Sequence, residues 1–163
     1  MTILRAFACA ISVAVGTFLA SSGASAQSPL GAPLFAVLNG GNECNNVVPP
    51  GGPDCRKGDP DGIGSATVIL IATTALCYAI AVDNLAGVSA AHIHRGVSSV
   101  NGGVVVTLNP PTAPSNGNPG TSSGCVGGLP TSTIAAIRGD RTSFYVNVRN
   151  AAFPDGAIRG QLH

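Results

Sequence analysis

The stretch that decides the fold is FYVNVRN, residues 144–150, in which apolar and polar side chains alternate. In an extended chain Phe144, Val146 and Val148 fall on one face, and the residues between them, Asn147 included, fall on the other. The stretch therefore predicts a β-strand with Phe144, Val146 and Val148 in the core.

Working outward, six further apolar runs lie between clusters of Gly, Pro, Asn and Asp, at 33–40, 63–74, 76–87, 89–96, 102–111 and 156–163. No helical periodicity extends over ten residues, and 22 glycines and 12 prolines interrupt the chain. We therefore predict an all-β fold whose strands pack in two layers or close on themselves.

Three segments need separate interpretations. In the run 76–87 a bulky set alternates with the small residues Cys77, Ala79 and Ala81, which predicts a central strand buried on both faces. Residues 109–124 are rich in Pro, Gly, Asn and Ser and predict a long surface loop. Residues 131–138 predict one short helical turn, with Thr131 or Ser132 as N-cap, and a strand is the alternative.

The first 26 residues have the features of a secretory signal peptide. Arg5 precedes an apolar run at 6–20, and Ala24-Ser25-Ala26 gives the small-residue cleavage pattern. We expect cleavage after Ala26, an uncleaved anchor being the alternative. Removing residues 1–26 from the 163-residue chain leaves 137 residues, which predicts a single domain at 27–163, secreted or periplasmic and without a membrane span.

The charge balance excludes two classes of partner. The chain has eight Lys and Arg against seven Asp and Glu, and loss of Arg5 makes the mature part formally neutral. Proteins that bind nucleic acid or anionic membranes usually carry a basic surface. We therefore expect neither partner.

Four cysteines lie beyond the predicted signal peptide, Cys44, Cys55, Cys77 and Cys125. An even number in an exported chain predicts two disulfides, and three pairings are possible. We favour Cys44 with Cys55 and Cys77 with Cys125. Because the chain has no CxxC motif, structural bridges are favoured over zinc or redox chemistry.

The stretch AHIHRG, residues 91–96, raises the question of a metal site. His92 and His94 share one face of a strand, and His163 at the end of the sequence is the third histidine. These three are the candidate ligands for copper or zinc, but such ions usually take three or four ligands. We predict weak or no metal binding, with the histidines hydrogen-bonding neighbouring strands and the following loop.

Other polar residues are assigned structural roles. Asp59 and Asp61 in DPDG predict a turn, because the further ligands of a calcium loop are missing. Arg159 shares a strand face with Gln161 and is predicted to hydrogen-bond several carbonyls at once. No catalytic set and no nucleotide loop is recognised, so we expect neither an enzyme nor a cofactor.

Three motifs together resemble the CHRD domain, the family named after the extracellular protein chordin. They are GDPDGIGSATVIL, AAHIHRGVSSVNGGVVVTL and FYVNVRNAAFPDGAIRGQL, which span residues 58–162. The resemblance implies an immunoglobulin-like antiparallel Greek-key β-sandwich of about seven to eight strands. The sequence departs from the family's usual pattern in three places. Arg149 replaces a usual histidine, Ala157 replaces a usual glutamate, and the segment from Cys44 to Cys55 resembles an insertion relative to the family.

For function, the resemblance implies an exported, non-catalytic module that acts in extracellular or envelope interactions, with an unknown protein as partner. A copper-handling or superoxide-dismutase-like protein using His92 and His94 is the alternative, because H-x-H followed by Gly on a β-sandwich is also seen in copper-zinc superoxide dismutases. That family needs further histidines and an Asp. A purely structural envelope protein is the third possibility.

Overall fold

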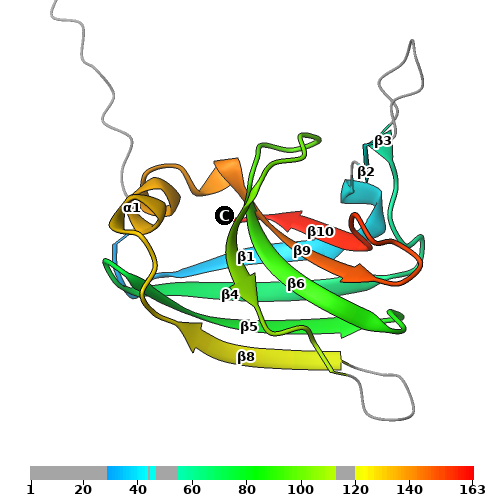
Figure 1. Cartoon of the computed structure of the whole chain (residues 1–163), viewed down its shortest axis with the longest axis horizontal. Coiled ribbons are helices and arrows are strands. Elements are labelled where there is room, and N and C mark those ends of the chain that lie inside the picture. Colours follow the sequence, from blue (N-terminus) through cyan, green and yellow to red (C-terminus); the bar gives the residue numbers. More distant parts are fainter. Residues whose placement is uncertain (1–28, 44, 47–54, 113–119) are drawn as a thin grey trace, which may run out of the picture.

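The computed structural model describes residues 29–43, 45–46, 55–112 and 120–163. Eight strands form one antiparallel sheet in the order β7-β6-β9-β10-β1-β4-β5-β8 (Figure 1). Their bounds are β1 Pro33–Asn39, β4 Ile63–Ala72, β5 Ala75–Asp83, β6 Val88–Arg95, β7 Val104–Leu108, β8 Gly120–Val126, β9 Phe144–Asn150 and β10 Ile158–Gln161. The all-β, antiparallel prediction is confirmed, and a strand lies in each of the seven predicted runs.

Smaller elements complete the described chain. A two-stranded ladder pairs β2 (Asn45–Asn46) with β3 (Cys55–Arg56). The 3-10 helices are η1 (Gly40–Asn42) and η2 (Arg141–Ser143), and the α-helix is α1 (Thr131–Gly139).

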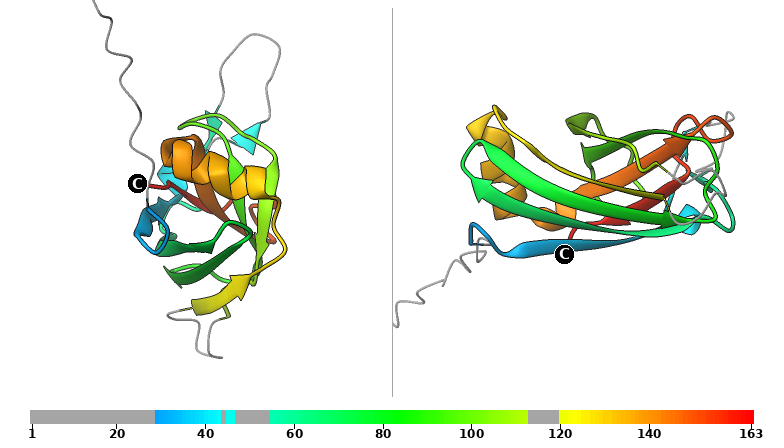
Figure 2. Two further views of the ribbon diagram at one scale, coloured as in Figure 1. Left: turned by 90° about the vertical axis from the view of Figure 1, so that its left-hand side faces the viewer. Right: turned by 90° about the horizontal axis from the view of Figure 1, so that it is seen from below.

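The sheet curls so that its two halves face each other across the core (Figure 2). Alternation along the strands sends every second side chain inward, and these side chains form one hydrophobic cluster. Leu38, Val68 and Ile80 enter it from β1, β4 and β5, while Ile93 and Val146 enter it from β6 and β9. At one point Thr112 and Thr121 exchange backbone hydrogen bonds of 3.1 and 3.2 Å, which joins the segment after β7 to the start of β8.

The prediction for residues 144–150 is correct, since Phe144, Val146 and Val148 are buried in the core. Their neighbours Tyr145 and Asn147 are only 2 % exposed although they point the other way. The outer face of β9 is therefore covered as well, by segments outside the sheet.

Two predictions about strands are wrong. The small residues of β5 are not buried, because Ala79 and Ala81 face solvent while Tyr78 and Ile80 face the core. The predicted loop at 109–124 ends early, because Gly120–Val126 is strand β8. Backbone pairing with β5 holds β8 in the sheet, so this edge strand needs no apolar side chains.

The helix prediction is correct, and α1 spans Thr131–Gly139 with Ile134 and Ile137 buried. Figure 2 shows α1 lying across one end of the curled sheet, where it covers the core. The predicted cap is wrong: Pro130 takes the N-cap position and no side chain caps the helix. Proline suits a helix start because its φ is preset and an N-terminal N–H has no partner in the helix.

The predicted signal peptide at 1–26 and Cys44 lie outside the described residues, and the Cys55 side chain does too. Among the helices of the described part, none has the length and apolar character needed to cross a membrane.

Candidate functional site

The outer face of β6, β9 and β10 carries a cluster of polar side chains. The strand register places His94, Tyr145 and Gln161 in one row across the sheet. His92, Asn147 and Arg159 form the next row. Alternation puts both rows on the same face, opposite the hydrophobic core.

Tyr145 is the centre of a stack. The His94 ring lies nearly parallel to the Tyr145 ring at a centroid distance of 4.9 Å. The guanidinium carbon of Arg159 lies 3.4 Å from the Tyr145 ring centroid. Such cation–π contacts strengthen when water is excluded, and Arg159 is only 1 % exposed.

Arg159 connects this stack to the loop between β6 and β7. One terminal nitrogen donates to the Val97 carbonyl at 2.8 Å and to Oε1 of Gln161 at 3.0 Å, and the other donates to Oδ1 of Asn101 at 3.3 Å. The Gln161 amide donates in turn to the carbonyls of Gly96 and Thr142. Loop 96–103 is therefore fastened over the outer face, which explains why that face is buried.

Asn147 binds a residue that sequence reasoning missed. Its side-chain amide donates to Oε1 of Glu43 at 2.9 Å, and Glu43 has no exposed surface. Burial lowers the pKa of Arg159, while Tyr145 and the Glu43 carboxylate partly offset that effect. The only sequence signal for Glu43 was a lone acid before Cys44, in the segment interpreted as an insertion.

His94 is buried in the same cluster, with 4 % of its surface exposed. Its Nδ1 lies 2.8 Å from the Gly102 carbonyl, and because a carbonyl only accepts, Nδ1 carries the hydrogen. Nε2 is buried and has no hydrogen-bond partner in the described part of the chain. Burial lowers the pKa of His94, and the positive charge of Arg149 adds to that effect although the Gly102 bond opposes it.

His92 stands edge-on to His94, with ring centroids 5.6 Å apart. Burial, and then the charge of Arg149, lowers the pKa of His92 too. Both imidazoles are therefore neutral near pH 7. The guanidinium of Arg149 lies close enough to affect both rings, which makes their surroundings unfavourable for a metal cation.

A cavity of about 180 Å³ opens beside His94. Its walls are His94, Asn101, Gly102, Tyr145, Arg149 and Asp155. The buried Nε of Arg149 has no hydrogen-bond partner among the described residues. Two unpaired nitrogens, on Arg149 and His94, therefore belong to side chains that line one small cavity.

His163 lies elsewhere. Its backbone exchanges hydrogen bonds with Phe35 of β1, and its side chain lines a different cavity of about 360 Å³ beside Arg159 and Gln161. In the described residues, no three His, Cys, Asp or Glu side chains gather at one point to hold a metal ion. Among the described residues, His92 and His94 therefore have no third side chain of these types beside them to complete a metal site.

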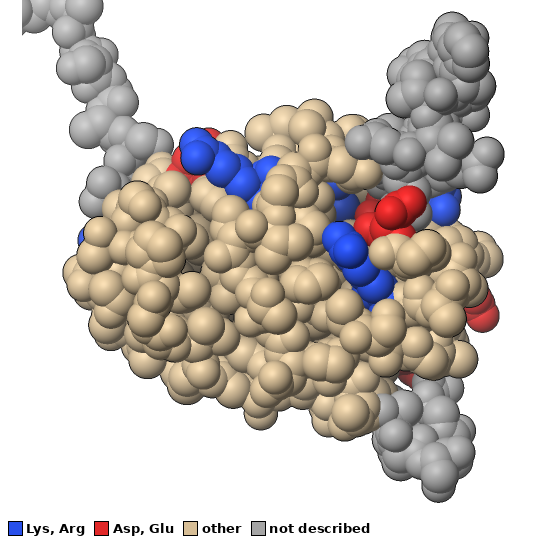
Figure 3. All heavy atoms as spheres, viewed as in Figure 1, with Lys and Arg blue, Asp and Glu red and all other residues tan. Residues whose placement is uncertain are grey.

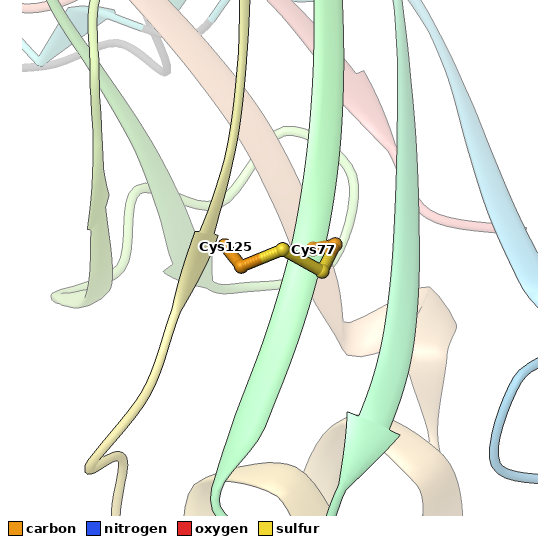
Figure 4. The surroundings of a disulfide bond; sticks show 2 residues. All are labelled: Cys77 and Cys125. Carbon is orange, nitrogen blue, oxygen red and sulfur yellow. A yellow bond between two sulfur atoms is a disulfide. The ribbon is translucent and has the colours of Figure 1, made fainter.

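The remaining predicted site residues have structural positions. Cys77 and Cys125 lie directly opposite each other on β5 and β8 and form a disulfide with a Cα–Cα distance of 3.9 Å (Figure 4). Asp61 is exposed in the bend after Pro60. Oδ1 of Asp59, not of Asp61, accepts from the Gly62 backbone across that bend at 3.3 Å.

The sequence model of the CHRD domain matches residues 34–162, from β1 to the residue after the last strand. The chain belongs to the CHRD domain family. The CHRD domain is typically a non-enzymatic module, and CHRD domains are typically extracellular or secreted. Searches of curated proteins and of solved structures found no match to this chain.

Proposed function

We propose that the protein is an exported CHRD module that binds a protein partner in the extracellular space or the cell envelope without catalysing a reaction. Residues 1–26 act as the signal peptide, and residues 27–163 form the mature domain, secreted or periplasmic. The observation that carries the proposal is the family match over residues 34–162.

The use of the polar side chains supports a binding module. Arg159, Gln161 and Asn147 each direct their hydrogen bonds to the protein itself, to loop 96–103 or to Glu43. A nucleophile with an adjacent base, which enzymes of acyl transfer need, has not been found in the described residues. The cluster therefore fastens a loop to the sheet.

The opposite half of the sheet offers a surface for a partner. On the outer face of β1 and β4, Phe35 is 55 %, Val37 73 % and Ile63 50 % exposed. A groove of about 450 Å³ runs beside Val37 and Ile63 toward β5. Exposed apolar clusters of this kind commonly mark protein interaction sites.

The lack of charge on this half of the sheet narrows the class of partner. Asp83 is the only charged residue on the outward faces of β1, β4, β5 and β8. In Figure 3 the charged side chains gather along the upper and right-hand parts of the view, and the broad lower part, over β5 and β8, is almost free of them. An uncharged, partly apolar surface fits an uncharged protein surface better than nucleic acid or anionic lipid.

The test is capture of envelope proteins with the wild-type protein and with two matched variants. Val37→Asp places a charge in the apolar surface, and Val104→Asp places a charge at another exposed valine, on β7, which is 47 % exposed. We expect a stoichiometric partner that V37D loses and V104D keeps. A partner kept by both variants would show that the interface lies on another surface. Reproducible turnover in a broad hydrolase and dismutase screen would overturn the non-catalytic proposal. Sedimentation analysis of the purified protein identifies the case in which the partner is a second copy.

A further inference from the structure

The outer edge of β8 has backbone groups that point away from the sheet. In the described part of the chain β8 is the last strand, at the lower border of the sheet in Figure 1, and its inner neighbour is β5. Thr121 exchanges both of its backbone hydrogen bonds with Thr112, so its N–H and C=O point away from β5. Every second residue of an antiparallel strand points the same way, which turns the backbone groups of Ser123 and Cys125 to the open side as well.

The disulfide gives the same assignment independently. Cys125 lies opposite Cys77 with a Cα–Cα distance of 3.9 Å. Antiparallel residues that exchange backbone hydrogen bonds have Cα atoms about 5.5 Å apart, whereas non-hydrogen-bonded pairs are about 4.5 Å apart. The N–H and C=O of Cys125 therefore do not bond to β5. Among the described residues, the outward backbone groups of Ser123 and Cys125 have no backbone partner.

The sheet protects its other edge but not this one. Proteins prevent exposed strand edges from pairing by means of Lys, Pro, β-bulges or short strands. At the opposite edge β7 has five residues and a register shift against β6, and Pro110 and Pro111 follow shortly after its end. By contrast, β8 has seven residues in unbroken register with β5, and it contains no charged residue and no proline. The edge of β8 is therefore open to a further strand.

The composition of β8 suits a second copy of this chain as that strand. In a symmetric pair each residue lies near its own counterpart, so any charge at the interface would meet a like charge. β8 carries no charge, and Asp83 of β5 lies beyond the last residue pair of the two strands, Val82 with Gly120. Pairing of β8 with β8 also ends after two copies. Pairing of β8 with β7 would continue without limit, and the bulge and prolines of β7 oppose it.

We propose that the protein forms a symmetric dimer in which β8 pairs antiparallel with β8 of a second copy. Thr112 occupies the edge at Thr121, so the free residues pair, and Ser123 lies opposite Cys125 of the second copy. Both such pairs exchange their backbone hydrogen bonds. Gly124 lies on the two-fold axis, where the strands approach most closely, and it has no side chain to clash there. The dimer leaves the apolar surface of β1 and β4 free, so it is independent of the partner proposed above.

Two measurements on the purified protein test the dimer. Sedimentation equilibrium should show a monomer–dimer equilibrium with a Kd of about 10–500 µM, because the pairing of one short strand makes a small interface. Amide hydrogen exchange should slow at Ser123 and Cys125 as the protein concentration rises. The amides of Ser122 and Gly124 face β5, so they should be protected at every concentration and serve as internal controls.

Three variants separate the edge from the rest of the sheet. Ser123→Lys should weaken the dimer at least about tenfold, because it brings like charges of the two copies together. Ser65→Lys is its control, since Ser65 is exposed on the same face of the sheet but lies on β4, with β5 between it and β8. Ser123→Pro removes the N–H that faces the open edge, a position where proline is tolerated, and should abolish the dimer without adding a charge.

Three results would overturn the proposal. One is a protein that stays monomeric up to about 1 mM. The second is a dimer that Ser123→Lys and Ser123→Pro leave unchanged, and its loss in Val37→Asp would then place self-association on the apolar surface. The third is protection of Ser123 and Cys125 that arises only when envelope extract is added, which would identify a strand of another protein as the occupant. Failure of the proposed function is seen separately, as capture of no envelope partner by the wild type.

Discussion

The Arg159 guanidinium lies 3.4 Å from the centre of the Tyr145 ring, on a face of the sheet that points away from the hydrophobic core. The same guanidinium donates to Val97 and Asn101 of the loop that covers it. One buried cation thus joins β9, β10 and loop 96–103. The stability of this half of the molecule therefore depends on a polar contact set as well as on apolar packing.

Replacement of Arg159 should be among the costly changes in the chain. Arg159→Met keeps an unbranched apolar stem, but the Val97 carbonyl loses its donor and the buried Glu43 carboxylate loses a nearby positive charge. We therefore expect a loss of about 3 kcal/mol or more in the free energy of unfolding. The stability of Arg159→Lys should fall between those of the wild type and Arg159→Met, because an ammonium group keeps the charge but has neither the planar fork nor the same stacking. Urea denaturation measures both.

Arg95→Met is the matched control for this prediction. Arg95 is exposed, and its guanidinium lies 6.0 Å from the Phe144 ring, so its loss should cost no more than about 1 kcal/mol. Equal losses in R95M and R159M would show that Arg159 has no special role.

Stability should decrease in mildly acidic solution because of His94. Its pKa is lowered in the folded protein, chiefly by burial, and the unfolded value is about 6.5. Below that pH the unfolded chain binds a proton that the folded protein resists, so the free energy of unfolding falls as the pH decreases. The groups that face His94 are His92, Arg149, Arg159, Tyr145 and Asp155.

His94→Gln keeps a side-chain donor for Gly102 and cannot titrate, so it should flatten the dependence of stability on pH between about 5 and 7. His92 contributes in the same direction, since its pKa is lowered as well. The check is a series of chemical denaturation curves across that range. An unchanged pH slope in a variant lacking both histidines would assign the effect to other groups.

The strands could be predicted from the sequence because their pattern is local. Alternation in FYVNVRN identifies its core residues whatever the neighbours are, and the pattern PLFAVLN at 33–39 behaves in the same way, with Leu34, Ala36 and Leu38 inward. Strand β8 was missed because its Ser and Gly residues, such as Ser122, Ser123 and Gly124, give no apolar alternation, and their place depends on pairing with β5.

The covered outer face could not be predicted for a related reason. Nothing in residues 96–103 shows that they fold over β9, since the contacts join positions about 60 residues apart, such as Val97 and Arg159. The pairing of Asn147 with Glu43, 104 residues apart, is of the same kind. Local patterns indicate which side chains share a face, whereas the covering of that face is a property of the tertiary structure.

The Cys77–Cys125 disulfide should stabilise the edge of the sheet. It closes a loop of sequence separation 48, and β8 itself buries few apolar side chains. Loss of the bridge should cost about 2–4 kcal/mol. A Cys77→Ala, Cys125→Ala variant should therefore unfold at lower urea concentration and show faster amide exchange in β8. A reducing agent should lower the stability of the wild type more than that of the double variant. If the two losses are equal, the Cys77–Cys125 bridge is not the stabilising element.

The second predicted disulfide, Cys44 with Cys55, remains a prediction. Mass spectrometry of peptides from the non-reduced protein should find Cys44 joined to Cys55 as well as Cys77 joined to Cys125. Free thiols at Cys44 and Cys55, or a peptide joining Cys44 to Cys125, would show that this pairing is wrong.

Gly58 should not tolerate a side chain. A Cβ atom there would overlap the Ala157 carbonyl, which accepts a hydrogen bond from Asp59, and would press on Glu43. Because the backbone must move, Gly58→Ala should cost about 2 kcal/mol or more. Gly127→Ala is the control, since no atom lies within 4 Å of its Cβ position. Thermal unfolding of both variants tests the contrast, and comparable midpoints would contradict it.

The histidine pair should become a metal site when Arg149 is replaced by histidine. In the wild type His92 and His94 are neutral imidazoles without a third ligand among the described residues, and Arg149 lies near both. Titration with zinc or copper should therefore give weak or no binding.

Arg149→His removes the repelling charge and adds an imidazole at the cavity wall that His94 shares, so we expect stoichiometric zinc binding with a Kd below about 10 µM. Arg149→Gln removes the charge without adding a ligand and should bind zinc more weakly than R149H. Submicromolar binding by the wild type that disappears in a His92→Ala, His94→Ala double variant would instead show that two imidazoles suffice and would restore the copper-handling interpretation.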